Sequence, residues 1–446
     1  MSDKSPRKPV PVPGAPRGVR TVKVDFLARV EGEGGVLVKL RDGRVTEVQL
    51  KIFEPPRFFE GFLRGRRLGE VPDITARICG ICPVAYQVSS VNAMEAALGI
   101  RLDEPLKLLR RLLYCGEWIE SHALHIYLLH APDFLGYPSG IHMAQDHGAE
   151  VQRGLEIKKT GNALVTAVGG REIHPVNVRV GGFHRAPSKK TLRELLPALE
   201  KARDDSLATI RWVSGFEFPE LVVEHELVAL RSPDVYAIED GRVVSSSGLD
   251  MDPSEYEKHF SEEQSPHSNA LHSRRRGGDA PYQVGPLARY SLNFDRLSPD
   301  AQRAAREVGL GPTCHEPFKS IVVRAVELFY ACEEAIRLVQ AYEPPEKSFR
   351  EAEPREADGH GVSEAPRGLL YHRYRLSAEG LVVAAKIVPP TSQNQRAMEA
   401  DLAVFAGARA AQPLDRLTLG CEHAVRNYDP CISCATHVLR VKVDRE

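Results

Sequence analysis

The sequence predicts a mainly α fold of the α+β type, with a long helical bundle and a small N-terminal β region. Two patterns predict it: alternating apolar residues are concentrated near the start of the chain, and long stretches with helical apolar spacing follow. The chain of 446 residues, 42% of them hydrophobic, is also long enough to bury a large core.

The N-terminal β region is expected to begin at Thr21. Closely spaced prolines make residues 1–20 a disordered or extended lead-in, because proline cannot donate to a regular ladder. Three strand-like runs then follow, separated by the turn sequences EGEGG and RDGR: VKVDFLARV, GVLVKL and VTEVQLKIF. They predict a small antiparallel sheet.

Helices are expected through most of the remaining chain. Pro83 suits the first position of a helix, and the apolar pattern continues to Gly99, a residue suited to ending one. Similar patterns predict helices at 104–131, 190–214, 318–343 and 394–411. The polar, Pro- and Gly-rich stretches 245–280 and 344–362 indicate surface loops, and the terminal VLRVKV a short strand.

Composition excludes several classes of function. A formal net charge of -1 gives no general electrostatic basis for binding nucleic acid or an anionic membrane. No apolar run approaches the ~20 residues of a membrane-spanning helix, and the N-terminus lacks the apolar core of a secretory signal. Eight unevenly spaced cysteines do not indicate a disulfide scaffold. We therefore expect a cytoplasmic protein with a metal site.

The first candidate ligands are Cys79 and Cys82 in the sequence RICGICP. A C-x-x-C pair places two thiolates close enough to share a metal, and Pro83 puts Cys82 near a helix N-terminus, where the backbone N–H groups favour a thiolate. This pair alone is equally consistent with a redox dithiol or with half of a zinc site.

The second pair is Cys431 and Cys434 in DPCISCATH, where Asp429 precedes a proline and is therefore biased to an extended conformation. The two pairs lie about 350 residues apart, whereas a zinc ribbon usually separates them by ~15–20, so a local zinc knuckle fits badly. Four thiolates brought together from the two ends of a chain can still hold soft metals such as nickel and iron.

These motifs resemble those of [NiFe] hydrogenase large subunits. The two cysteine pairs are similar to the family's nickel-ligand signatures, and four further segments match in the expected order: RVEGEG (29–34), FFE (58–60), GGREIHPVNVRVGGF (169–183) and EAPRG (364–368). The resemblance implies the [NiFe] hydrogenase large-subunit fold, with a catalytic domain over 21–437.

It also implies a nickel–iron centre whose iron carries carbonyl and cyanide ligands. Cys79 and Cys431 would be terminal ligands of nickel, and Cys82 and Cys434 would bridge to iron. Cofactor-binding residues implied beside them are Thr391, as a hydrogen-bond donor to a cyanide ligand, and Pro366.

Dihydrogen is a very weak acid, so its heterolytic cleavage needs a metal to accept the electron pair and a base to take the proton. The thiolate of Cys431 is the expected base, and the resemblance makes Glu31 the proton relay. Without the resemblance, Glu31 is more simply a solvated turn carboxylate. Arg367 is expected to act as a second base or to order the site by pairing with Asp429, although an arginine after proline is usually a surface residue.

The resemblance assigns Glu60 and His437 to a magnesium or similar divalent cation. Their simpler interpretations are a helix-start carboxylate and a buried, hydrogen-bonded histidine. Two places depart from the family pattern. Ser121 stands where many relatives have an aspartate, and Pro390 and Thr391 stand where others show two hydroxyl residues. His122 and His125 are expected to support the site or the core rather than bind metal. The remaining cysteines are most simply buried apolar residues: 115, 314, 332 and 421.

The nine residues after His437 are expected to be a C-terminal extension, 438–446, which the family loses once nickel is inserted. Cleavage between His437 and Val438 would require a maturation endopeptidase and nickel-insertion proteins as partners.

No Gly-rich dinucleotide loop appears, and the remaining cysteines form no set that suits an iron–sulfur cluster. We therefore expect an iron–sulfur small hydrogenase subunit as a partner. Flavin- and NAD(P)-binding diaphorase subunits are expected as well, since VGPLARYSLNFDRLSP (284–299) resembles the cytoplasmic NAD(P)-linked, sulfhydrogenase-like branch. The alternatives are a hydrogen-sensing regulatory subunit, the quinone-site subunit of respiratory complex I, which lacks the paired cysteines, and a zinc-stabilised protein.

Overall fold

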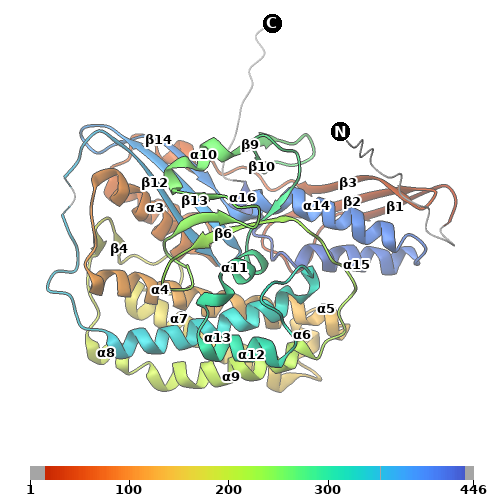
Figure 1. The fold of residues 1–446 in the computed structure, drawn as a ribbon, viewed down its shortest axis with the longest axis horizontal. Coiled ribbons are helices and arrows are strands. Elements are labelled where there is room, and N and C mark those ends of the chain that lie inside the picture. Colours follow the sequence, from red (N-terminus) through yellow and green to blue (C-terminus); the bar gives the residue numbers. More distant parts are fainter. Residues whose placement is uncertain (1–15, 352, 437–446) are drawn as a thin grey trace, which may run out of the picture.

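The computed structural model describes residues 16–351 and 353–436. A layer of long helices runs side by side across the lower part of Figure 1: α4 (Glu104–Leu124), α7 (Gly148–Gly169), α9 (Leu196–Ser214) and α13 (Ser320–Ala341). Together with α3 (Pro83–Leu98) they enclose the largest apolar cluster, which includes Trp118 and all four paired cysteines. The mainly α fold with a helical bundle is as the sequence predicts.

Helix α3 follows the sequence prediction closely. It begins at Pro83 and ends before Gly99, whose φ of 71° is the left-handed conformation of a helix C-terminus. The helix expected over 104–131 is interrupted, because α4 passes into a π-helical turn, η3 (His125–His130), and then α5 (Ala131–Leu135). Such turns insert a residue into the ladder and are often found at functional sites.

The N-terminal sheet contains the three expected strands, antiparallel in the order β1 (Val19–Val24), β2 (Gly34–Arg41) and β3 (Arg44–Ile52). The first strand is shorter than predicted, because the chain leaves the sheet after Val24. Arg29 there has a left-handed φ of 59° and forms an ion pair with Asp133. The segment that looked like the end of a strand instead carries Glu31 toward the cysteines.

A second antiparallel sheet corrects the prediction that residues up to 362 form a loop. It contains β12 (Ala357–Ala365), β13 (Gly368–Leu376) and β14 (Val382–Val388), and β12 packs on α3. The approach is so close that a Cβ on Gly361 would lie 2.4 Å from the carbonyl oxygen of Ser89. Glycine stands where an apolar side chain would normally mark a buried strand, so the alternating pattern is missing.

The stretch 245–280 is also more ordered than the surface loop expected from its polarity. Its strands and helix share an apolar cluster with β13, since Met251, Tyr256 and Phe260 pack with Tyr371. The elements of this region and its neighbours are β6 (Glu226–Arg231), β7 (Arg242–Ser245), β8 (Asp250–Met251), α10 (Tyr256–His259), β9 (Phe260–Gln264), β10 (Leu271–Arg275) and β11 (Tyr282–Gln283).

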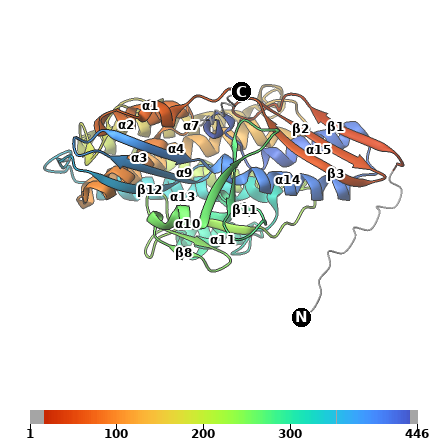
Figure 2. The same cartoon turned by 90° about the horizontal axis from the view of Figure 1, so that it is seen from above.

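The C-terminal helices return to the N-terminal sheet. Helix α14 (Pro390–Ala408) packs on β3 and α15 (Leu414–Arg426) on β1, as Figure 2 shows from above. This return brings the short α16 (Ile432–Ala435) to the N-terminal cysteine pair. Smaller elements complete the described chain: α1 (Phe59–Leu63), η1 (Leu68–Glu70), α2 (Val71–Thr75), η2 (Ala76–Ile78), α6 (Gly140–Met143), β4 (Val178–Arg179), β5 (Gly182–Phe183), α8 (Lys189–Arg193), η4 (Pro253–Glu255), α11 (Pro286–Asn293), η5 (Phe294–Arg296), α12 (Pro299–Glu307) and η6 (Pro317–Lys319).

Across residues 16–351 and 353–436, none of the helices combines the length and apolarity needed to cross a bilayer. The strand predicted for VLRVKV, the C-terminal extension 438–446 and His437 lie outside the described residues.

Candidate metal centre

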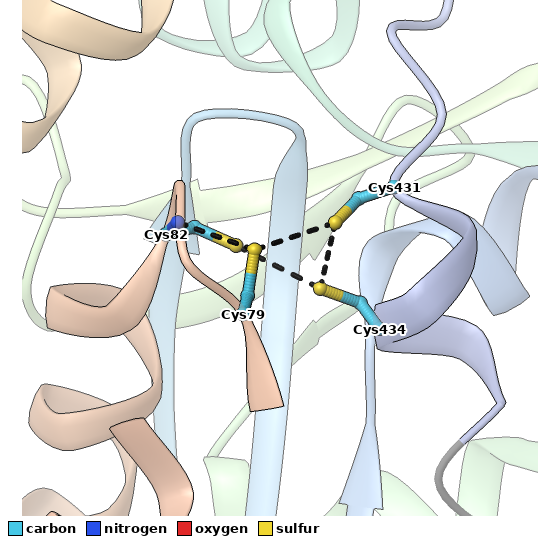
Figure 3. A group of neighbouring side chains, drawn as sticks. All are labelled: Cys79, Cys82, Cys431 and Cys434. Atoms are coloured by element: carbon cyan, nitrogen blue, oxygen red, sulfur yellow. Dashed lines mark hydrogen bonds between the residues drawn. The ribbon is translucent and has the colours of Figure 1, made fainter. Parts of the chain in front are cut away.

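The four paired cysteines converge on one point, with all four sulfur atoms within 4.8 Å of one another. Cys79 follows η2 and Cys82 precedes the first turn of α3, while Cys431 and Cys434 belong to the start of α16 (Figure 3). The Sγ atoms lie 3.5 Å apart for Cys79 and Cys431, and 3.7 Å apart for Cys82 and Cys434. All four side chains are buried.

Arg57 holds the two chain ends together. Its Nη2 donates to the carbonyl oxygen of Ile78 at 2.7 Å and to that of Ser433, so one guanidinium spans both cysteine segments. Its backbone N–H also donates to the carbonyl oxygen of Thr436 at 2.8 Å. No local sequence pattern indicates this role, because Arg57 is separated from its C-terminal partners by almost the whole chain.

Glu117 anchors the start of α3, immediately after Cys82. Its carboxylate accepts from the backbone N–H of Val84 at 2.6 Å and from that of Ala85 at 3.1 Å, at the positive end of the helix dipole. A glutamate inside a predicted helix carries no sequence signal for this role, so it was missed as well.

The donor set suits a soft cation. Hydrogen bonds from Cys431, Cys434 and Cys82 hold the pKa of the Cys79 thiol well below its usual value. Burial and its sulfur neighbours raise the pKa of Cys431 well above the usual value, and burial raises that of Cys434. The protein alone therefore favours ionisation of only part of the cluster. A divalent metal supplies the charge that four buried thiolates require.

Glu31 lies directly against this cluster. Its Oε2 is 3.0 Å from the Sγ of Cys431 and accepts a hydrogen bond from the backbone N–H of Ser433, also at 3.0 Å. A parallel bridge pairs Glu31 with Cys431. The next residue, Gly32, packs so tightly that a Cβ there would lie 2.7 Å from the Cβ of Ile432. Glu31 is thus not the freely solvated turn carboxylate of the simpler interpretation.

Arg367 and Asp429 form a buried pair beside the sulfurs. Arg367 donates through Nε to the carbonyl oxygen of Asp429 at 2.8 Å and through Nη2 to its Oδ1 at 3.1 Å. Asp429 Oδ1 also lies 3.1 Å from Nδ1 of His125. Burial alone would raise the pKa of Asp429, but Arg367 and His125 hold it far below the usual value.

One nitrogen of the Arg367 guanidinium is also available to donate a hydrogen bond to a ligand. Burial would lower its pKa, yet Asp429 and the thiols of Cys431 and Cys82 raise it well above the usual value. Its Nη1 is buried without a hydrogen-bond partner in the described part of the chain. An unused cationic donor beside four sulfurs fits a site that holds metals with small polar ligands.

The remaining predicted residues are placed as follows. Thr391, in the first turn of α14, accepts a hydrogen bond on Oγ1 from the backbone N–H of Cys431 at 3.0 Å. Pro366 is buried in the turn between β12 and β13, and its carbonyl oxygen accepts from Arg289 at 2.9 Å. Glu60, in α1, accepts on Oε1 from the backbone N–H of Ile387 at 2.8 Å. Its predicted partner His437 lies outside the described residues.

The three residues singled out in the 119–130 segment, Ser121, His122 and His125, are buried. Ser121 is 1% exposed, and its Oγ has no hydrogen-bond partner among the described residues. Nε2 of His122 is 3.2 Å from the carboxylate of Glu327, while His125 contacts Asp429 as above. The other four cysteines are buried in the core, as expected: 115, 314, 332 and 421.

Comparisons with known proteins agree with this geometry. The family described as nickel-dependent hydrogenase matches residues 57–168 and 255–437. The chain is 36% identical over 429 residues to sulfhydrogenase 2 subunit alpha of Pyrococcus furiosus, covering 94% of this chain and 100% of that protein. It is 35% identical to sulfhydrogenase 1 subunit alpha of the same organism, covering 94% and 98%.

A solved structure of an NAD+-reducing [NiFe]-hydrogenase in the H2-reduced state superimposes with a TM-score of 0.85 at 28% identity, covering 94% of this chain and 99% of that one. A [NiFeSe]-hydrogenase from Dm. baculatum shares the fold, with a TM-score of 0.74 at 21% identity, covering 94% and 100%.

Proposed function

Since the chain belongs to the nickel-dependent hydrogenase family, as the catalytic large subunit with a four-cysteine nickel–iron site, we propose that it passes the electrons of dihydrogen to NAD(P) through partner subunits. The reaction is the reversible heterolytic cleavage of dihydrogen. The observation that carries the proposal is the convergence of four buried sulfurs from the two ends of the chain.

The metal ligands of the proposal are the four thiolates. The thiolates of Cys79 and Cys431 would hold the nickel, and those of Cys82 and Cys434 would hold nickel and iron. When bound, the nickel–iron centre supplies the Lewis acid that takes up the electron pair of dihydrogen. The chain's own residues then have to receive and remove the proton.

Cys431 and Glu31 form the first step of the proton route. The Sγ of Cys431 accepts the proton, and Oε2 of Glu31, at 3.0 Å, is within reach to take it onward. The backbone N–H of Ser433 donates to that same oxygen and holds it beside the sulfur. Glu31 is partly exposed, so its proton can pass to the molecular surface.

The small ligands of the metals would be lined by Arg367, Asp429, Thr391 and Pro366. Asp429 fixes the guanidinium of Arg367 through two bonds, which leaves Nη1 to interact with a ligand. Thr391 accepts from Cys431 and so retains its hydroxyl hydrogen for a cyanide nitrogen. Pro366 immediately precedes Arg367 in the buried turn between β12 and β13.

Electrons have to leave through another protein. Within the described residues the four site cysteines are the only group of three or more cysteines close enough to share a metal or cluster. An iron–sulfur small subunit is therefore the proposed acceptor, followed by flavin- and NAD(P)-binding diaphorase subunits. The sulfhydrogenase alpha relatives and the NAD+-reducing structure support this branch. A cytoplasmic location follows from the proposed nucleotide acceptor.

Maturation is the remaining part of the proposal. We infer that 438–446 is removed after His437 once nickel is inserted, leaving a catalytic domain over 21–437. Glu60 and His437 then bind a magnesium or similar cation. Arg57 supports this arrangement, since its bond to Thr436 brings the segment that leads into α1 beside the end of the described chain.

The test is purification of the native complex, followed by counting nickel and iron, recording carbonyl and cyanide infrared bands, and measuring hydrogen-dependent reduction of NAD+, NADP+ and an artificial dye. Rapid reduction of a nucleotide is the expected result. Dye reduction without nucleotide reduction would refute the NAD(P) branch and leave the hydrogenase assignment intact. Very slow turnover with every acceptor would favour the hydrogen-sensing alternative.

A further inference from the structure

A second group of metal-binding side chains lies outside the cysteine site, where the β9–β10 hairpin meets α14. One ligand atom from each of His267, His272 and Glu399 lies within 4.8 Å of the others. His267 belongs to the loop between the two strands, His272 to β10 and Glu399 to α14. Strand β10 packs against α14, and the two are neighbours in Figure 1. Three separate parts of the fold therefore present their donors to one place.

Two of these donors are already oriented. Nε2 of His267 lies 2.7 Å from Oε1 of Glu399, while its Nδ1 lies 2.9 Å from the hydroxyl of Ser265. A partner on the far nitrogen is what fixes a metal-binding histidine in proteins. Glu399 is held in turn, since its Oε1 accepts from the backbone N–H of Leu50 in β3 at 2.8 Å.

The third donor is a buried imidazole without a full set of partners. His272 is 5% exposed, and its Nε2 has no hydrogen-bond partner in the part of the chain that the structure describes. A buried polar atom left unpaired costs about 1–3 kcal/mol, so a ligand at this position would relieve a real penalty. Burial lowers the pKa of His272, which favours the neutral ring that binds metals.

We propose that His267, His272 and Glu399 bind a divalent transition-metal ion of the zinc type. Two imidazole nitrogens and one carboxylate oxygen suit zinc and leave a fourth position for water. The loop that the ion would fasten already donates from the N–H of Asn269 to the carbonyl oxygen of Ile52, and Ala270 packs on Ile432 beside Cys431. The ion would thus stabilise the β9–β10 loop, against which the C-terminal cysteine segment packs.

The experiment counts zinc in the purified native complex after zinc loading and desalting. We expect about one zinc per chain. His267→Ala and Glu399→Gln should lose it while nickel content stays unchanged. His142→Ala is the matched control, because His142 also bonds a serine hydroxyl, at 2.8 Å, yet belongs to no three-ligand group of the described residues. Equal zinc in all four proteins, or none in the wild type, overturns the proposal.

A second measurement needs no variant and so remains decisive if the variants fold poorly. Zinc-edge X-ray absorption of the wild-type complex should show nitrogen and oxygen neighbours at about 2.0–2.2 Å, with the signature of two imidazoles. Sulfur neighbours at about 2.3 Å would place the ion on the cysteines instead and overturn the proposal.

Discussion

Arg57 should control how firmly the two halves of the metal site stay together. Replacing it by alanine removes the two side-chain hydrogen bonds to Ile78 and Ser433, which join the N- and C-terminal cysteine segments. The cysteines themselves and their immediate backbone are left unchanged. Arg57→Ala therefore tests the connection between the chain ends separately from the ligands.

The free energy lost in Arg57→Ala can be estimated from these two hydrogen bonds. A hydrogen bond from a charged donor contributes about 1.5–3 kcal/mol, and the group is only partly buried, so we take about 3 kcal/mol for the pair. Each 1.4 kcal/mol is a factor of ten, so the separated state should become about 100-fold more populated. Arg57→Lys keeps one donor and the charge, and should show roughly a tenfold effect.

The assay is the rate at which the purified complex loses nickel to an excess of chelator. It should rise about 100-fold in Arg57→Ala if metal escapes through the separated state. Arg66→Ala is the control, because Arg66 is exposed and its contact with Glu70 is a 3.5 Å surface ion pair worth little. Nickel loss at the wild-type rate in Arg57→Ala would refute this account of how the ends are held.

Four further predictions follow from the site and its surroundings. Glu31→Gln keeps a hydrogen-bond acceptor but cannot carry a proton, so hydrogen-dependent dye reduction should fall about 100-fold or more at unchanged nickel content; turnover within twofold of the wild type contradicts the relay. Arg367→Lys loses the two-bond fork to Asp429, and activity should fall roughly 10–100-fold, measured with metal content and infrared bands; full activity would show that the fork is dispensable. Burial lowers the pKa of His423 to about 4, so the folded chain binds fewer protons than the unfolded one between about pH 6.5 and 4, and stability is lost as pH falls through that window. His423→Gln should reduce this pH-dependent loss in the free energy of unfolding by up to about 3 kcal/mol, measured from acid unfolding curves. An unchanged pH dependence would show that His423 does not cause the loss. The active enzyme should have an intact mass that ends at His437, and a mass that includes residue 446 would contradict processing.

Features that depend on neighbouring residues could be predicted from the amino-acid sequence. The C-x-x-C spacing put two thiols within reach of one metal, and Pro83 and Gly99 set the limits of α3, because their backbone preferences act locally. The order of the short motifs was enough to indicate the family, which the comparisons then showed.

Patterns failed where burial did not come from a regular apolar face. The sequence predicts a loop over the first part of strand β12, because Gly361 packs against α3 with no side chain to produce an alternating signal. The first strand was extended too far, because the same apolar run continues past Val24 into the turn that carries Glu31.

The contacts between groups that are distant in the sequence become visible in the folded chain alone. Glu31 reaches Cys431, Arg57 spans both cysteine segments, and Glu399 faces His267, each across more than a hundred residues. Such contacts depend on the packing of whole sheets and helices against each other, a property of the folded chain that no local periodicity records. Physical chemistry could assign the cysteines from their spacing, but their neighbours become functional only through the fold.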